Sequence, residues 1–234
     1  MIRFNRAIAP VSVLSFDLDD TLYDNRPIIK AAVQAQTDYL NTLPGYQHKG
    51  LQQWLHCRDC ALQQQPKLIE DVTQWRLQTL GLLLAKQGFN ADDAKHFASA
   101  AYKVFAQARS NITVTDDVLN LLDKLATRFT LIAITNGNAD VSQFNLNNKF
   151  NLVLQAGLHG KAKPHNNLFD QAATHLQVPH KAILHIGDSL DSDVQGANNA
   201  GCQSVWLNNQ AANYTYKGLA DIEITNINAL SHLI

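Results

Sequence analysis

Three carboxylates stand within four residues near the start of the chain, at Asp17, Asp19 and Asp20. They follow residues 11–16, a short run rich in β-branched and other apolar side chains that is typical of a buried strand. Carboxylates this close repel one another, so the pKa of at least one should rise unless a cation or hydrogen-bond donors compensate the charge. Mg²⁺ prefers oxygen ligands and is the natural partner. An isolated Asp-x-Asp is more often a solvated loop, so the rest of the chain must decide.

Polar residues also accompany the ends of three later stretches that are predicted as strands. Thr135 and Asn136 come at the end of one, Lys163 follows the second, and Asp188 and Asp193 follow the third. In open parallel sheets, ligands bind beyond the carboxyl ends of the strands. We therefore expect carboxylates, a hydroxyl and a lysine to meet at one edge of the sheet.

Phosphoryl transfer needs such a set of groups. Phosphate monoesters are anions that hydrolyse extremely slowly unaided, so a catalyst must neutralise charge and supply an aligned nucleophile. A carboxylate can attack phosphorus when a metal ion and a cation offset its repulsion from the substrate. The leaving alkoxide needs a proton, and a neighbouring acid can supply it. Two carboxylates can divide these tasks.

These positions belong to a pattern in which strands and helices alternate. Strands are expected at residues 11–16, 129–135, 152–155, 182–187, 203–207 and 222–224, and helices at 118–125, 165–176, 194–200 and after 224. Such alternation is typical of a parallel sheet with helices on both faces. The fold class is therefore predicted as α/β, with a Rossmann-like, doubly wound parallel sheet.

The stretch between the first two strands has helical periodicity throughout. Four amphipathic stripes follow one another, a pattern typical of a small helical bundle. The bundle separates the first strand from the rest of its sheet and is therefore an insertion. We predict a discontinuous catalytic core of residues 1–23 and 112–234, with an α-helical cap domain of residues 24–111 inserted into it.

Composition restricts the class of protein further. The 234 residues are 46% hydrophobic and 17% charged, a balance typical of globular proteins. A net charge of -1 and the lack of a basic tract argue against a nucleic-acid partner. No apolar run is long enough to span a membrane, and the first ten residues lack the apolar core of a secretory signal. We expect a cytoplasmic protein without a membrane partner; the sequence leaves open whether it is a monomer or a homodimer.

The cysteines predict neither a disulfide scaffold nor a zinc site. Cys57 and Cys60 form a Cys-x-x-Cys inside a helical pattern, and Cys202 lies far along the chain. Three cysteines are an odd number and too few for a disulfide framework. A zinc ion would need two further ligands at plausible spacing. The pair is expected to lie on one turn of a helix.

Four segments resemble the motifs of the haloacid dehalogenase-like hydrolase superfamily, in the same order along the chain. They are DLDDT at 17–21, ITNGN at 134–138, GKAKP at 160–164 and GDSLDSDVQGANNAG at 187–201. Each motif alone is weak evidence, because a strand-end threonine or a turn glycine is common. Four at compatible spacing are strong evidence. The resemblance covers the whole chain and includes a helical cap after the first motif.

The resemblance implies a role for each matching residue. Asp17 would be the nucleophile, and Asp19 the general acid and base. Thr135 and the backbone amide of Asn136 would bind the phosphoryl oxygens. Lys163 would neutralise the phosphate and hold Asp17 in place, an electrostatic role.

The same resemblance implies a Mg²⁺ cofactor. Asp17, Asp188 and the backbone carbonyl of Asp19 would bind the ion. Asp193 fits the last acid of the fourth motif and would bind through water or hold Lys163. Asp191 lies between these two acids and is expected to be a solvated residue at a helix start.

At closer range the chain is similar to bacterial phosphatases of flavin mononucleotide and of 5-amino-6-(5-phospho-D-ribitylamino)uracil, a riboflavin precursor. The similarity lies in DLDDTLYDNRP, DVTQWR, FAQARS, ITNGNA and GLHGKAKP. Two of these segments lie in the cap, where Trp75 could stack on a planar ring and Arg76 or Arg109 could bind polar edges or phosphate. Helix periodicity equally places Trp75 in the core of the cap.

Alternative functions stay open at this point. Release of a halide needs no proton, so an acid at Asp19 favours phosphate esters over haloacids. Within the superfamily, a sugar-phosphate or nucleotide phosphatase of broad specificity is the alternative. From another class, a phosphate-binding regulator without turnover would keep the same fold.

Overall fold

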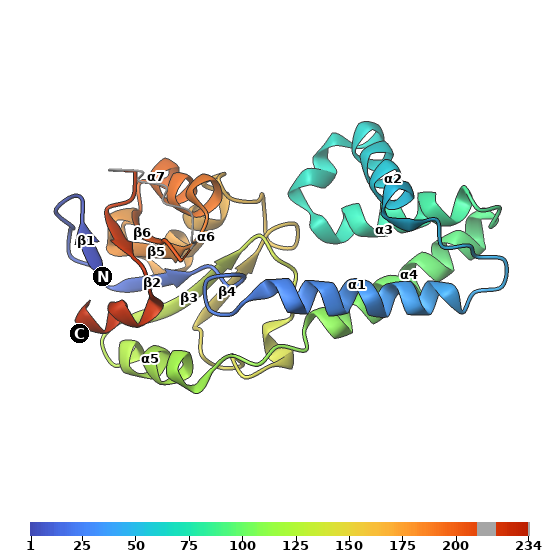
Figure 1. Ribbon diagram of the computed structural model, residues 1–234. Coiled ribbons are helices and arrows are strands. Elements are labelled where there is room, and N and C mark those ends of the chain that lie inside the picture. The colour runs from blue at the N-terminus through green and yellow to red at the C-terminus, as the bar shows by residue number, and fades with distance from the viewer. Residues whose placement is uncertain (210–218, 234) are drawn as a thin grey trace. The chain divides into compact units, whose positions relative to one another are not determined.

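The computed structural model describes residues 1–209 and 219–233, and the chain separates into two compact units (Figure 1). One unit combines the segments Met1–Asp24, Thr113–Gly137 and Asn145–Ile234. The other combines Asn25–Ile112 with Asn138–Phe144. The second unit thus holds the stretch that was predicted as a helical cap, together with a short segment that follows the second motif.

One sheet organises the first unit, and its order among the described residues is β1-β7-β6-β5-β2-β3-β4. The strands are β1 Ile2–Phe4, β2 Val13–Phe16, β3 Thr130–Thr135, β4 Leu152–Gln155, β5 Ile183–Gly187, β6 Gln203–Leu207 and β7 Ile222–Ile224. Neighbouring strands run parallel except β1 and β7, which are antiparallel. The predicted α/β fold is confirmed.

Two details of the predicted strands are wrong. No strand was predicted before residue 11, but β1 closes one edge of the sheet and Arg3 forms an ion pair with Glu223 of β7. Three residues with a charged one at the centre are too short to show a strand period. The second strand begins at Val13 rather than at Val11.

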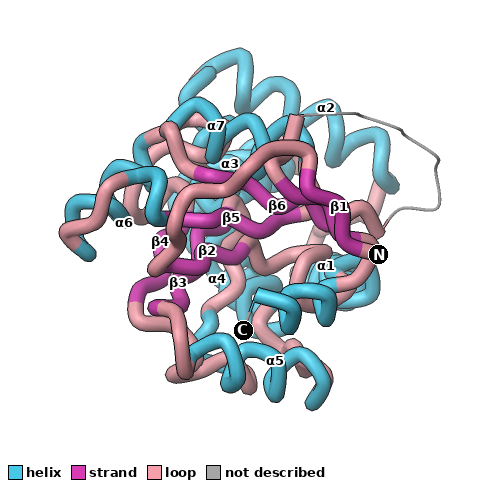
Figure 2. The backbone as a smooth tube through the Cα atoms, turned by 90° about the vertical axis from the view of Figure 1, so that its left-hand side faces the viewer, coloured by secondary structure: helices cyan, strands magenta, loops and turns pink. Residues whose placement is uncertain are grey.

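Helices cover both faces of this sheet. Figure 1 and Figure 2 show α6 (Asn167–Leu176) and α7 (Gln195–Ala200) on one face, and α5 (Asp116–Ala126) on the other. The helix that was expected after residue 224 is a 3-10 helix, η5 (Ile227–Leu233), which packs beside α5. Helix α5 has an apolar stripe at i, i+3, i+4 and i+7, formed by the buried side chains Val118, Leu121, Leu122 and Leu125.

Four α-helices form the second unit, as the periodicity predicted. They are α1 Asn25–Asn41, α2 Gly50–Gln64, α3 Val72–Ala85 and α4 Ala91–Arg109, with a 3-10 turn η1 at Pro66–Glu70. Two helix starts are capped by side chains. The Asp71 carboxylate accepts hydrogen bonds from two backbone N–H groups of α3, and the Asn90 side chain accepts one from α4. Cys57 is buried in the core of this unit.

In the described part of the chain, no helix is both long and apolar enough to cross a membrane. The cysteines are free, and Cys57 and Cys60 lie on α2 as predicted.

Candidate active site

Strand β2 ends at a buried aspartate. The N–H of Asp17 donates to the carbonyl of Ile186 in β5 at 2.8 Å, so the backbone of this residue continues the sheet. The chain then turns back on itself, and Asp20 adopts a left-handed conformation with φ of 56°. After this turn the Tyr23 hydroxyl donates to Asp19 Oδ1 at 2.8 Å. The turn thus gives Asp17 and Asp19 different surroundings, one buried and one partly exposed.

Lys163 is the centre of the polar contacts at this edge. Its Nζ donates to Asp17 Oδ1 at 2.8 Å, to Asp193 Oδ1 at 2.7 Å and to the carbonyl of Ile134 at 2.5 Å. An ammonium group has three N–H donors, so these acceptors use all of them. Only 3% of Lys163 is exposed, which strengthens each charge-assisted contact.

The loop after β3 positions this lysine and its neighbours. The backbone N–H of Lys163 donates to Asn136 Oδ1, and Asn136 Nδ2 donates back to the Lys163 carbonyl. Thr135 Oγ1 accepts from the N–H of Gly137 and keeps its own hydrogen available for an oxygen ligand. A Cβ atom on Gly137 would overlap with the Asp19 carboxylate. Glycine is therefore required here for Asp19 to approach the loop.

The second pair of acids lies after β5. Asp193 Oδ2 accepts from the N–H of Ser189 at 2.9 Å, and Thr21 Oγ1 donates to Asp188 Oδ1 at 3.4 Å. A Cβ atom on Gly187 would overlap with Asp193, so this glycine admits the carboxylate. A π-helical turn, Leu190–Val194, precedes α7, which begins at Gln195, one residue after the predicted helix start. This turn buries Asp193 and leaves Asp191 exposed.

The acids that were predicted as metal ligands come together. Carboxylate oxygens of Asp17, Asp188 and Asp193 all lie within 4.8 Å of one another. With Lys163 as the cation among them, three carboxylates leave two negative charges uncompensated in a largely buried site. A divalent cation with oxygen ligands would supply the missing charge, so the residues present fit Mg²⁺. The Asp19 side chain is not part of this cluster, and a metal contact of its backbone carbonyl stays a prediction.

The pKa values of the three acids are shifted in opposite directions. Burial raises the pKa of Asp17 to about 8, although Lys163 opposes the shift. Burial also raises the pKa of Asp188 to about 6, with a further rise from the charge of Asp193. The pKa of Asp193 falls well below its usual range, because Lys163 and His185 outweigh its burial. The pKa of Lys163 is raised by the two carboxylates it contacts. Asp193 is therefore the charged partner of Lys163.

The three residues predicted to bind substrate from the cap lie in the helical unit. The Trp75 indole N–H donates to the carbonyl of Arg58, and the Arg58 guanidinium lies 4.0 Å from the ring centroid. Arg76 donates to Gln36 and stacks on Phe105 at 3.6 Å from the ring centroid. These contacts serve the packing of the helices. The role of all three toward a substrate stays a prediction.

Arg76 and Arg109 still differ from ordinary packing residues. Arg109 is only 2% exposed, and burial together with the charge of Arg58 lowers the pKa of Arg76 to about 10. Arginines gathered in one buried region repel one another, and an anionic ligand would relieve that repulsion. The arrangement of Arg76 and Arg109 fits both helix packing and the binding of an anionic ligand.

Sequence reasoning missed His185, which lies inside the buried strand β5. Its ring contacts Ser15, Asp193 and Lys163, and burial lowers its pKa to about 4. The only signal in the sequence was one polar residue in the apolar run AILHIG. Tyr23, which donates to Asp19, was missed as well, because a tyrosine after a turn has no distinctive pattern.

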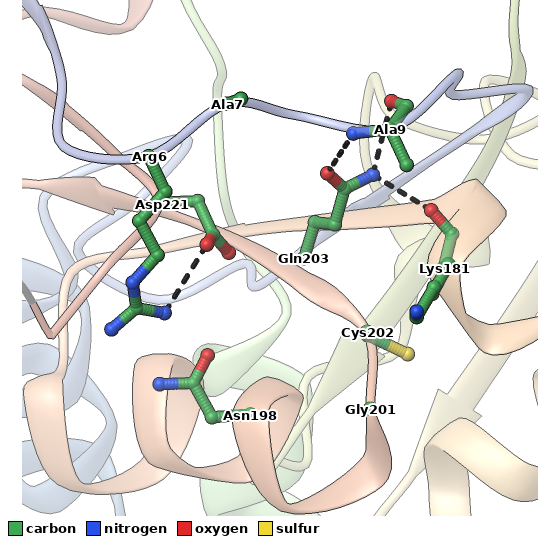
Figure 3. Close-up of a pocket in the computed structure, with 9 residues that line it drawn as sticks. All are labelled: Arg6, Ala7, Ala9, Lys181, Asn198, Gly201, Cys202, Gln203 and Asp221. Carbon is green, nitrogen blue, oxygen red and sulfur yellow. Dashed lines mark hydrogen bonds and ion pairs between the residues drawn. The ribbon is translucent and has the colours of Figure 1, made fainter.

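A pocket of about 490 Å³ lies elsewhere in the same unit (Figure 3). Its lining includes Ala9 before β2, Lys181 before β5 and Cys202 before β6, so it is at the amino ends of these parallel strands. Ligands of such sheets bind at the opposite, carboxyl ends. Gln203 crosses the pocket wall and binds the backbone of Ala9 and Lys181. The pocket is therefore separate from the carboxylates of the candidate active site, and the hydrogen bonds of Gln203 hold one of its walls together.

Comparison with known proteins agrees with this geometry. A model of the family described as haloacid dehalogenase-like hydrolase matches residues 11–201. The 5-amino-6-(5-phospho-D-ribitylamino)uracil phosphatase YigB of Escherichia coli is 37% identical over 241 residues, which cover 100% of both chains. The glyceraldehyde 3-phosphate phosphatase of Methanopyrus kandleri is 27% identical and is matched over 83% of both chains.

A solved structure described as 2-haloacid dehalogenase from Pseudomonas syringae pv. Tomato is also similar. Its TM-score is 0.90 with 32% sequence identity, and the match covers 95% of this chain and 97% of that one. The match extends over both units of this chain.

Proposed function

The chain belongs to the haloacid dehalogenase-like hydrolase family and is a phosphoric monoester hydrolase, and we propose that its substrate is 5-amino-6-(5-phospho-D-ribitylamino)uracil, flavin mononucleotide or both. The observation that carries the reaction is the contact of Asp17 with Lys163, beside the Asp188 and Asp193 carboxylates. The full-length relative from Escherichia coli supports the substrate. Both candidates attach a phosphate to a ribityl chain on a planar ring.

In the first step, a carboxylate oxygen of Asp17 attacks phosphorus. The bond from phosphorus to the ester oxygen breaks, and the leaving alkoxide takes a proton from the Asp19 carboxyl group. Lys163 and the Thr135 hydroxyl stabilise the charge on the phosphoryl oxygens. The products are the free alcohol and an aspartyl-phosphate on Asp17.

In the second step, water attacks phosphorus and gives its proton to the Asp19 carboxylate. The bond from Asp17 to phosphorus breaks, which releases inorganic phosphate and restores both acids. Asp19 therefore acts first as an acid and then as a base, and it ends in its starting protonation state. The hydrogen bond from Tyr23 orients this carboxyl group in both steps.

Mg²⁺ would be held by Asp17, Asp188 and the carbonyl of Asp19, with Asp193 behind them, and it would supply positive charge toward the phosphate. Asp193 accepts from Lys163 and from the N–H of Ser189. Asp193 holds the Lys163 ammonium group beside Asp17. Asp193 could also contact the ion through a water molecule.

The similar structure described as a dehalogenase makes haloacid cleavage the second candidate. In that reaction a carboxylate displaces a halide from carbon, and the halide leaves as an anion without a proton. Such chemistry has no use for an acid at Asp19 that is oriented by Tyr23. The pair favours an ester whose leaving group must be protonated.

The test is phosphate release from a panel of esters, with Mg²⁺ or EDTA. The panel contains both riboflavin-pathway candidates, sugar phosphates and nucleotides, and 2-chloropropionate is assayed in parallel for halide. Asp17→Asn should lower kcat by about a thousandfold or more. Asp191→Asn is the matched control, because Asp191 is an exposed acid of the same motif, and its kcat should equal that of the wild type.

Each outcome points to one function. Metal-dependent turnover that is lost in Asp17→Asn supports the mechanism, and a preference for ribityl phosphates supports the substrate. A preference for sugar phosphates or nucleotides would change the proposed substrate and leave the proposed mechanism in place. Halide release would favour the dehalogenase, and binding without turnover of any ester would favour the regulator. Equal turnover of flavin mononucleotide by the wild type and by Trp75→Ala with Arg76→Ala would count against substrate binding by Trp75 and Arg76.

A further inference from the structure

Ser15 and His185 form a polar pair in the buried interior of the sheet. They are register partners on the neighbouring parallel strands β2 and β5, and neither is exposed. Their side chains meet at 2.9 Å, between Ser15 Oγ and His185 Nδ1. Apolar side chains lie beside them: Ile132 of β3 is the register partner of Ser15, and the Phe169 ring contacts the His185 ring. A buried polar pair is costly unless its hydrogen bonds are satisfied. The contacts of the other ring nitrogen of His185 therefore indicate the role of the pair.

The other ring nitrogen of His185 reaches the candidate active site. Nε2 lies 3.2 Å from Asp193 Oδ1 and 3.5 Å from Lys163 Nζ. The three hydrogens of Lys163 are already directed to Asp17, Asp193 and the Ile134 carbonyl. None is left for His185. Nε2 must therefore carry a hydrogen and donate it to Asp193.

The tautomer of His185 follows from this count. In a neutral ring with a hydrogen on Nε2, Nδ1 is an acceptor, so the Ser15 hydroxyl is its donor. The edge-to-face contact with Phe169, with ring centroids 5.0 Å apart, further fixes the plane of the ring. Hydrogen bonds thus run in one direction from Ser15 through His185 to Asp193, which in turn binds Lys163.

We propose that Ser15 and His185 are positioning residues, which hold Asp193 and through it Lys163 in the arrangement that serves the Asp17 nucleophile. The proposal rests on the proposed function. Neither residue touches the reacting atoms. Asp193 Oδ1 accepts from both Lys163 and His185, so loss of the histidine frees this carboxylate to rotate and to draw Lys163 away from Asp17. Ser15 acts one step further back, by setting which nitrogen of His185 is the donor.

The experiment compares the wild type with four single variants and with the double variant that combines Ser15→Ala and His185→Leu. His185→Leu removes the donor to Asp193 and keeps an apolar side chain, whereas His185→Gln offers an amide N–H in place of Nε2. Ser15→Ala removes only the hydroxyl. Ser204→Ala is the matched control, because Ser204 is an equally buried serine of β6 whose hydroxyl bonds Asn198 and Asp221 instead. Circular dichroism establishes that each variant is folded at the assay temperature.

The assay measures kcat, KM and the Mg²⁺ concentration for half-maximal activity on the best ester of the panel. His185→Leu should lower kcat at least about tenfold and raise the half-maximal Mg²⁺ concentration. His185→Gln should recover most of the loss. Ser15→Ala should lower kcat about threefold, and it should have no further effect on kcat in His185→Leu. A purely structural role would lower the folded fraction and leave KM and the Mg²⁺ requirement unchanged.

Several results would overturn the proposal. These are a folded His185→Leu whose kcat and Mg²⁺ requirement match those of the wild type, a folded His185→Gln that is as impaired as the leucine variant, or equal losses of kcat in Ser15→Ala and Ser204→Ala. If His185→Leu does not fold, the comparison of Ser15→Ala with Ser204→Ala decides alone. A wild type without activity on any ester would instead refute the proposed function, so the two failures are distinct.

Discussion

Asn136 and Lys163 hold each other by two hydrogen bonds, although they are separated by β4 in the sequence. The N–H of Lys163 donates to Asn136 Oδ1 at 2.8 Å, and Asn136 Nδ2 donates to the Lys163 carbonyl at 2.9 Å. The resemblance implied a role for the backbone of Asn136 only. Its side chain fixes the backbone of the lysine, while Asp17 and Asp193 fix the lysine Nζ.

Asn136→Ala should therefore lower kcat by about 10- to 100-fold, because Lys163 is no longer held within a fraction of an ångström of its place. Steady-state phosphate release measures the effect. The chain contains a matched control in Asn145, whose side chain forms the same pair of bonds with the backbone of Val114 at 2.9 and 2.7 Å. Asn145→Ala should reduce the free energy of unfolding by about 1–3 kcal/mol and leave kcat unchanged. Equal losses of activity in both variants would contradict a specific role for Asn136.

Tyr23 should matter most for substrates with poor leaving groups. Its hydroxyl donates to Asp19 Oδ1 at 2.8 Å, and Asp19 must protonate an alkoxide but not a nitrophenolate. Tyr23→Phe should lower kcat for an alkyl phosphate about 3- to 10-fold and change turnover of p-nitrophenyl phosphate much less. Tyr39→Phe, in the helical unit, serves as the control. A uniform loss on both substrates would assign Tyr23 to folding rather than to the orientation of Asp19.

Removal of divalent metal should make stability fall as the pH rises. The folded-state pKa of Asp17, about 8, and that of Asp188, about 6, both exceed the ordinary aspartate pKa of 3.8. Between pH 3.8 and the folded-state pKa of each group, the folded chain binds more protons than the unfolded chain. The stability that Asp17 and Asp188 contribute is therefore complete below pH 3.8, and it is lost as the pH rises through their folded-state pKa values. Thermal unfolding in EDTA should thus show a lower midpoint at pH 8 than at pH 5.5.

Mg²⁺ should reverse this trend, because it binds the charged carboxylates of the folded state. At one hundred times its Kd it should add about 2.7 kcal/mol to the free energy of unfolding at pH 8, and less at pH 5.5, where protons compete. Asp188→Asn should reduce the gain. A midpoint at pH 8 that is the same in Mg²⁺ and in EDTA would exclude the three acids as a metal site.

Strands that repeat a buried apolar pattern could be predicted from the sequence to within a residue or two. β4, β6 and β7 have the predicted bounds, and β5 differs by one residue. β1 could not be predicted, because its three residues become a strand only through antiparallel pairing with β7, more than two hundred residues later. The π-helical turn at Leu190–Val194 has a similar origin. The Asp193 side chain in this turn accepts hydrogen bonds from Lys163 and from the N–H of Ser189. Helix propensity does not take such contacts into account.

The acids and the lysine of the candidate site were identifiable because their spacing follows the ends of parallel strands. The groups that hold them were not. His185 looked like one more member of a buried strand, and the side chain of Asn136 looked like a turn residue. Both act through partners distant in sequence, and a pattern read along the chain contains no information about which partner a polar side chain will find.

The cysteines allow a last prediction, about reactivity. Burial raises the pKa of the Cys202 thiol to about 12 and also raises the pKa of Cys57, whereas Cys60 is partly exposed on α2. Because the thiolate is the reactive form, Cys57 and Cys202 should react slowly with a disulfide reagent at pH 8. Titration of the native protein should show about one fast thiol, and unfolding should expose three.

Cys60→Ser should remove the fast thiol and leave the two slow ones, which identifies the reactive position. Cys57 and Cys60 lie three residues apart on one helix, with Cys57 in the core of the helical unit, so the pair behaves as two independent thiols. Fast reaction of two thiols in the folded protein would show that Cys57 or Cys202 is open to solvent. Fast reaction of Cys57 would contradict its burial in the core of the helical unit, whereas fast reaction of Cys202 would show that the reagent reaches it through the pocket that it lines.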